Sequence, residues 1–141
     1  MMTVSNTSQN ATSPAWHRQR NTGFGTTAAQ ALGARPRALY LARDHVALFD
    51  PADEVRALAP DFDAMRRIEG CIGLVATAPG DGSCDFVSRY FAPHDGIVED
   101  PVTGSAHCTL VPFWSERLGR REVTARQISA RGGTLYCRDE G

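Results

Sequence analysis

The segment Gly96 to Cys108, GIVEDPVTGSAHC, places acidic residues close to small polar ones. Asp100 precedes a proline, which disfavours helical backbone angles and holds the carboxylate on a stiff, extended turn. Thr103, Gly104 and Ser105 follow, where a run with helical spacing begins. The first N–H groups of a helix lack internal partners and lie at the positive end of its dipole, so they can hold a carboxylate. This combination suits an enzyme that moves a proton beside a bound carboxylate.

A purely structural interpretation of the same segment also stands. Thr103 or Ser105 can serve as an ordinary N-cap, worth about 1 kcal/mol. Glu99 and Asp100 can simply complement the helix dipole. The spacing alone favours this second interpretation, because an acidic-Pro-x-Thr-Gly-Ser turn carries no unique mechanism.

The elements that must position this segment are indicated by hydrophobic spacing and turn residues. Helices are predicted within residues 26–36, 51–60 and 62–70, and most clearly over 105–118, where Gly119 supplies the stop and Pro112 predicts a kink. A hairpin is predicted within residues 37–50. Two further strand pairs are predicted, one at 71–80 and 84–93, the other at 121–130 and 134–138.

Length and charge fit one globular domain with no general attraction to nucleic acid or anionic membranes. The chain has 141 residues and a formal net charge of -1. Residues 1–27 are polar and are expected to form a disordered tail before a domain at 28–141. No apolar run is long enough for a signal peptide or a membrane span, so a cytoplasmic location is expected. The four scattered cysteines are expected to be reduced.

The motif DFVSRYFAPHDGIVEDPVTGSAHC, with ALGARP before it and WSERLG and ARQISARGG after it, closely resembles a known family. It is similar to the carboxy-terminal domain of the PhzF-like (phenazine biosynthesis protein-like) isomerases, relatives of diaminopimelate epimerase. The likeness runs from about Ala28 to about Arg138, and EDPVTGSA is its most specific part. The resemblance implies an α+β fold of two similar halves, each a curved mixed or antiparallel sheet or barrel around a central helix, with the active site between them.

The resemblance also implies roles for residues of the opening segment. In that family the Asp of the E-D-P motif lies in the active-site cleft, which assigns a catalytic role to Asp100. The T-G-S segment lines the site of the substrate carboxylate, which assigns substrate binding to Thr103, Gly104 and Ser105. The implied activity is a cofactor-independent isomerisation or epimerisation of a small carboxylate-bearing metabolite by acid/base proton transfer, with no metal.

The resemblance covers only one half of such an enzyme, because the principal acid/base Glu of the family belongs to the other half. The chain is therefore expected to be a truncated carboxy-terminal half. Its expected partners are a small carboxylate substrate and a missing amino-terminal domain or a second copy of the chain. A non-catalytic remnant or small-anion-binding module is the alternative. A thiol or metal site at His107 and Cys108 is disfavoured, because adjacent helical residues point in different directions.

Overall fold

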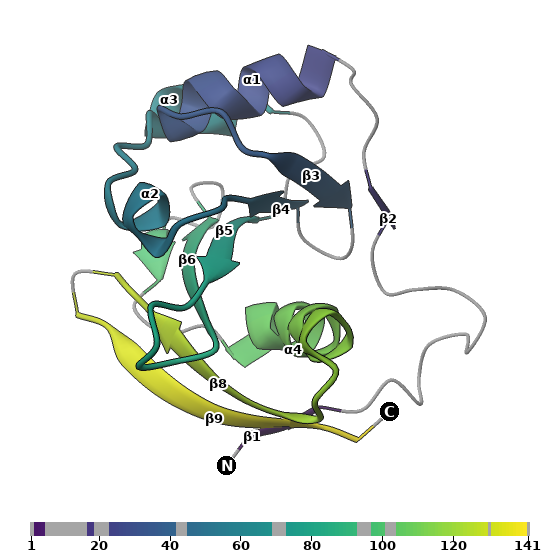
Figure 1. Ribbon diagram of the computed structural model, residues 1–141. Coiled ribbons are helices and arrows are strands. Elements are labelled where there is room, and N and C mark those ends of the chain that lie inside the picture. The colour runs from purple at the N-terminus through teal and green to yellow at the C-terminus, as the bar shows by residue number, and fades with distance from the viewer. Residues whose placement is uncertain are drawn as a thin grey trace.

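The computed structural model describes residues 2–4, 17–18, 23–41, 45–68, 73–92, 97–100, 104–129 and 131–140. In this part of the chain a curved mixed sheet wraps around one long helix, and three shorter helices cover the other face of the sheet (Figure 1). The predicted α+β class and the sheet around a central helix are therefore confirmed. None of the described helices has both the length and the apolar character needed to cross a bilayer.

The sheet contains parallel and antiparallel pairs. The described strands are β1 (Met2–Val4), β2 (His17–Arg18), β3 (Ala38–Leu41), β4 (His45–Leu48), β5 (Leu74–Pro79), β6 (Phe86–Ala92), β7 (Ile97–Asp100), β8 (Glu122–Gln127) and β9 (Gly133–Asp139). The described helices are α1 (Gly23–Leu32), α2 (Ala52–Arg56), α3 (Phe62–Arg66) and α4 (Gly104–Leu118). The strand order is β1-β9-β8-β6-β5-β4-β3-β2, and β7 also pairs with β6. The β1–β9, β4–β5 and β6–β8 pairs are parallel, and the others are antiparallel.

Alternating side chains give the sheet two apolar faces. On β6, Phe86 and Tyr90 belong to the buried cluster that contains α4, whereas Val87 and Phe91 belong to the cluster beneath α1, α2 and α3. A strand covered on both sides is apolar along its length rather than alternating. This explains why β5, buried from its first residue to its fifth, has the continuous apolar sequence that predicted a buried strand.

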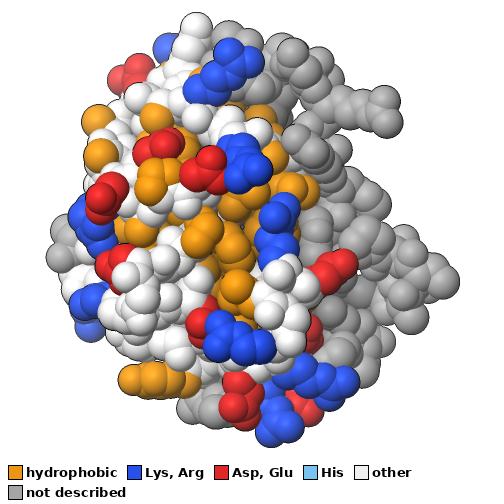
Figure 2. Space-filling view, in the orientation of Figure 1, with side chains coloured by type: hydrophobic (Ala, Val, Ile, Leu, Met, Phe, Trp, Pro, Cys, Tyr) orange, Lys and Arg blue, Asp and Glu red, His pale blue; other side chains and the backbone are white. Residues whose placement is uncertain are grey.

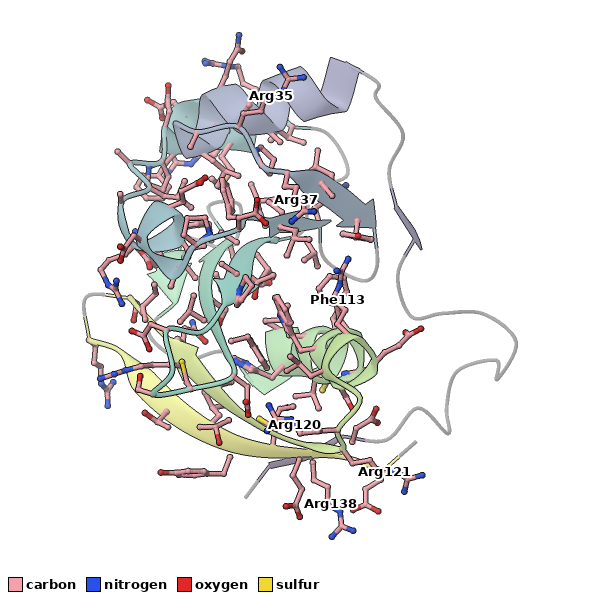
Figure 3. The ribbon with its side chains drawn as sticks, viewed as in Figure 1. Arg35, Arg37, Phe113, Arg120, Arg121 and Arg138 are labelled. Carbon is pink, nitrogen blue, oxygen red and sulfur yellow. The ribbon has the colours of Figure 1, made fainter. Side chains whose placement is uncertain are left out.

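The aromatic residues of α4, Phe113 and Trp114, lie in the core. The Trp114 ring stacks on Phe86 with ring centroids 5.6 Å apart. Phe113 points from α4 toward β3, where its ring meets the edge of Tyr40 at 5.0 Å (Figure 3). The Arg117 guanidinium lies 4.6 Å from the Phe113 ring centroid and donates to the Tyr40 hydroxyl at 2.6 Å. These contacts fasten the last turns of the central helix to the sheet.

Glycine marks the ends of α1 and α4, whereas α2 ends at Arg56 and α3 at Arg66, short of the predicted ranges 51–60 and 62–70. Gly33 follows α1 with φ of 80°, and Gly119 follows α4 with φ of 68°, a backbone region that favours glycine. The Asp61 side chain accepts a hydrogen bond of 3.1 Å from the Ala64 N–H and so caps α3. The α4 helix continues through Pro112. On the face seen in Figure 2, hydrophobic side chains gather between the upper helical layer and α4, bordered by charged side chains.

The segment 1–27 differs in part from the predicted disordered tail. Met2–Val4 pairs with β9, His17–Arg18 pairs with β3, and α1 already begins at Gly23. The edges of a sheet offer unpaired backbone groups, and these bind a strand whatever its side chains are. Composition therefore does not reveal such strands. The domain boundary at residue 28 stays a prediction.

Candidate active site

The candidate site lies where β7 ends and α4 begins. β7 ends at Asp100, and α4 begins at Gly104. The sequence predicts an extended backbone at Asp100, on a stiff turn that belongs to no predicted strand. The structure corrects this, because Asp100 is the last residue of a strand and pairs with Tyr90 of β6. Backbone pairing therefore fixes the position from which the carboxylate is presented.

The other predicted site residues follow at the start of α4. Gly104 is the first residue of this helix and Ser105 is the second. Fifteen residues of aligned peptide dipoles stand behind this end, so the first N–H groups carry the full partial positive charge of a long helix. Thr103, the Asp100 carboxylate and the Ser105 hydroxyl lie outside the described part of the structure. Only residues 101–103 separate the end of the strand from the start of the helix in the sequence.

Two strands, β7 and β8, pair with the same edge of β6. β8 pairs with its first half, at Phe86 to Ser88, and β7 pairs with its second half, at Tyr90 to Ala92. The register shifts between Phe91 and Ala92. The sheet therefore forks along this edge, and Arg89 lies at the fork between the two pairings.

Arg89 forms a two-pronged ion pair with Glu99, the residue directly before Asp100. Nε of Arg89 donates to Oε2 of Glu99 at 2.9 Å, and Nη2 donates to Oε1 at 2.8 Å. The two side chains are only 12% and 20% exposed. Parallel N–H···O bonds of this kind are both strong and geometrically specific. The guanidinium also lies 5.1 Å from the centroid of the Phe91 ring.

The same guanidinium contacts the end of α2. Its Nη1 donates to the carbonyl oxygens of Val55 at 3.1 Å and Leu58 at 2.9 Å. Carbonyl groups at a helix end lack internal partners and carry partial negative charge, so a cation is favourable there. This arrangement was not predicted from the sequence, although a lone arginine within the apolar strand FVSRYFA signals it.

His107 and Cys108 lie on different sides of α4. His107 is fully buried, with its ring centroid 6.0 Å from that of Phe86, whereas Cys108 is exposed. This agrees with the expectation that the two side chains point in different directions. Within the described ranges, no group of three or more His, Cys, Asp or Glu side chains is placed to hold a metal ion.

Comparison with known proteins identifies relatives over most of the chain. A family model described as phenazine biosynthesis-like protein (PhzC-PhzF) matches residues 4–140. An uncharacterized isomerase of Pseudomonas aeruginosa is 50% identical over 113 residues, which cover 79% of this chain and 42% of that protein. The phenazine biosynthesis-like domain-containing protein 2 of Mus musculus is 47% identical over 78 residues, which cover 54% of this chain and 27% of that protein.

Solved structures show the same similarity in three dimensions. A PhzF-family phenazine biosynthesis protein from Enterococcus faecalis superposes with a TM-score of 0.82 at 38% identity, covering 88% of this chain and 46% of that one. A putative phenazine biosynthesis PhzC/PhzF protein from Clostridium difficile gives a TM-score of 0.79 at 37% identity, covering 89% of this chain and 48% of that one. The chain thus spans less than half the length of these relatives.

Proposed function

Because this chain belongs to the phenazine biosynthesis-like (PhzC-PhzF) family, we propose that it forms one side of the active site of a cofactor-independent isomerase or epimerase. The reaction is the transfer of a proton at a carbon atom of a small carboxylate-bearing metabolite. The 50% identical relative from Pseudomonas aeruginosa, an uncharacterized isomerase, supports the reaction class. Asp100 either orients the substrate or takes part in the proton shuttle.

The observation that carries this proposal is the direct succession of a strand ending at Asp100 and a long helix beginning at Gly104. In the proposed mechanism the first N–H groups of α4, with Thr103, Gly104 and Ser105, bind the substrate carboxylate. Removing a proton from the neighbouring carbon places negative charge next to that group. Fixed N–H dipoles stabilise such charge without reorganising as it develops.

A small-anion-binding module without turnover is the second candidate. The chain spans 42% to 48% of the first relative and the two solved structures, and the resemblance places the principal acid/base Glu of the family in the other half. We propose that an amino-terminal half, or a second copy of the chain, completes the cleft. The two candidates then differ in a measurable way: only the enzyme exchanges substrate hydrogen with solvent.

The test is deuterium uptake from deuterated water into a panel of small carboxylic acids, followed by NMR. The chain is assayed alone and with the amino-terminal half of the Pseudomonas aeruginosa relative. We expect label only in the combined preparation, and Asp100→Asn should lower its rate about 10²-fold or more. Ser105→Ala should mainly raise KM, because Ser105 is proposed to bind rather than react.

The test includes one control variant and two outcomes that would contradict the proposal. Asp63→Asn changes a carboxylate that is 81% exposed and should leave the exchange rate unchanged. Full exchange by Asp100→Asn removes Asp100 from the mechanism. Retention of a carboxylate ligand without label in any preparation supports the binding module instead.

A further inference from the structure

We propose that the Arg89–Glu99 ion pair is a positioning device that sets the place of Asp100 by fixing the end of β7 to α2. This inference rests on the proposed function, because it assigns a purpose to the position of Asp100. Arg89 and Glu99 are positioning residues in it, since they act through the strand and touch no substrate. Four structural observations carry it.

The first observation is the register of β6 and β7. Glu99 lies opposite Phe91, which belongs to the cluster beneath the outer helices, whereas Asp100 lies opposite Tyr90, which belongs to the cluster around α4. Successive residues of a strand occupy opposite faces. The ion pair therefore holds the strand at the residue directly before Asp100. Because adjacent Cα atoms are about 3.8 Å apart, a movement of Glu99 is passed on to Asp100.

The second observation is the short backbone pairing between β7 and β6. The strand has four residues, and three residue pairs join it to β6 in the described structure, with a register shift among them. Short edge pairing of this kind opens readily by local fluctuation. A side-chain anchor at Glu99 therefore adds to the pairing that holds the last residue of the strand.

The third observation is the geometry and burial of the anchor. Two N–H···O contacts of 2.9 and 2.8 Å fix both the distance and the plane of the Glu99 carboxylate relative to Arg89. With exposures of 12% and 20%, water compensates each charge only in part when its partner is removed. Lysine is a point charge without the planar fork, so it cannot reproduce this geometry.

The fourth observation is the contact of Arg89 with α2. Its remaining nitrogen, Nη1, donates to the carbonyl oxygens of Val55 and Leu58. The guanidinium thus joins β6, β7 and the end of α2, and it cannot follow a displaced Glu99 without leaving these carbonyls. The end of β7 is therefore held in place by the outer helical layer as well as by β6.

The decisive experiment needs no substrate. In isotope-labelled protein, NMR follows amide hydrogen exchange along the chain and the side-chain carboxyl carbon resonance of Asp100. In Glu99→Gln we expect the β7 amides to exchange about tenfold faster and the Asp100 resonance to move, with the β4 and β5 amides unchanged. Arg89→Lys should do the same, and Asp63→Asn, which breaks an exposed ion pair with Arg66, should do neither.

Unchanged β7 exchange and an unchanged Asp100 resonance in folded Glu99→Gln overturn the proposal. Uniformly faster exchange throughout the protein also overturns it, because that is the result for a pair that only stabilises the fold. If Arg89→Lys does not fold, Glu99→Gln and the shorter charged variant Glu99→Asp still decide the question. Glu99→Asp retains the charge, so an effect there isolates geometry.

The combined preparation adds a kinetic readout that separates this proposal from the proposed function. Glu99→Gln should lower kcat about tenfold or more while KM stays within about threefold, because a misplaced acid or base weakens the chemical step more than binding. If Asp100→Asn remains fully active, the role proposed for Asp100 in the reaction fails whatever the NMR result. If Asp100→Asn is inactive but Glu99→Gln matches the unmodified chain, the positioning role alone fails.

Discussion

The indole N–H of Trp114 on α4 donates a hydrogen bond of 3.0 Å to Oγ1 of Thr77 on β5, and both side chains are buried. Oγ1 of Thr77 in turn donates to the Val87 carbonyl oxygen of β6 at 2.7 Å. One hydroxyl group therefore connects the central helix with two strands. Buried polar groups in such a chain are costly to leave without partners.

Replacing Thr77 by valine should destabilise the fold by about 1–3 kcal/mol, because the Trp114 N–H then stays buried without an acceptor while the side-chain volume hardly changes. Urea unfolding followed by Trp fluorescence measures the loss. Thr134→Val is the matched control at an exposed position of β9 and should change stability by less than about 0.5 kcal/mol. Equal effects of the two variants would contradict the role assigned to the Thr77 hydroxyl.

Because the thiol of Cys137 on β9 is buried, we expect the protein to lose stability at alkaline pH. Burial raises the pKa of its thiol from 9.0 to about 11. Between these values the unfolded chain releases the proton and the native protein keeps it, so stability is full below pH 9 and falls as the pH rises toward 11. The expected loss of unfolding free energy across this window is roughly 3 kcal/mol. All 15 basic side chains are arginine, so no lysine titrates in this window.

The measurement is the free energy of unfolding in urea at several pH values from 8 to 11, with a reductant present. Cys137→Ala should lower stability at pH 8, because it leaves a small cavity. Above pH 9, however, the stability of this variant should fall less steeply with pH than that of the unmodified protein. The control is Cys108→Ala, an exposed position of α4 that should preserve the original pH dependence. Parallel curves for Cys137→Ala and the unmodified protein would refute the prediction.

Residue 73 must be a glycine, because the side chain of Tyr90, the strand partner of Asp100, occupies the space where a Cβ atom would lie. A Cβ atom at residue 73 would lie 2.2 Å from the Tyr90 hydroxyl oxygen and 2.6 Å from Cζ. Gly73→Ala should therefore destabilise the protein by about 1–3 kcal/mol, because the whole ring must move. A double-mutant cycle with Tyr90→Leu should recover much of this loss.

Gly82→Ala provides the control for that cycle. No atom lies within 4 Å of a Cβ there, and its φ of 108° makes alanine unfavourable for backbone reasons alone. Tyr90→Leu should therefore leave the cost of Gly82→Ala unchanged. A cost of Gly73→Ala that is independent of the residue at position 90 would show that the clash is relieved elsewhere.

Hydrophobic spacing predicted those elements whose burial follows a simple period. The helix α4 and the strands β5 and β6 were located in this way, and glycine marked the helix ends at Gly33 and Gly119. β7 was missed because its four residues, IVED, include only two apolar ones. The parallel β6–β8 pairing was not predicted either, since it depends on how α4 crosses the sheet.

The candidate site was predicted only as far as it is local in sequence. Asp100 and Gly104 are four positions apart, and one motif revealed both; their functional roles stay predictions. The Arg89–Glu99 pair connects residues ten positions apart through the register of two strands. Neither residue type nor spacing encodes that register, so the residues that position Asp100 became visible only in three dimensions.

The arrangement of β6 beside β8 also constrains the order in which the molecule assembles. Phe86 pairs with Ala125, and the intervening chain contains β7 and the whole of α4, which ends up in the concave face of the sheet (Figure 1). Closing a loop of this length costs conformational entropy before any contact compensates for it. Nucleation is therefore expected in the neighbouring β5–β6 hairpin, and the β8–β9 hairpin joins it last, after the central helix has docked.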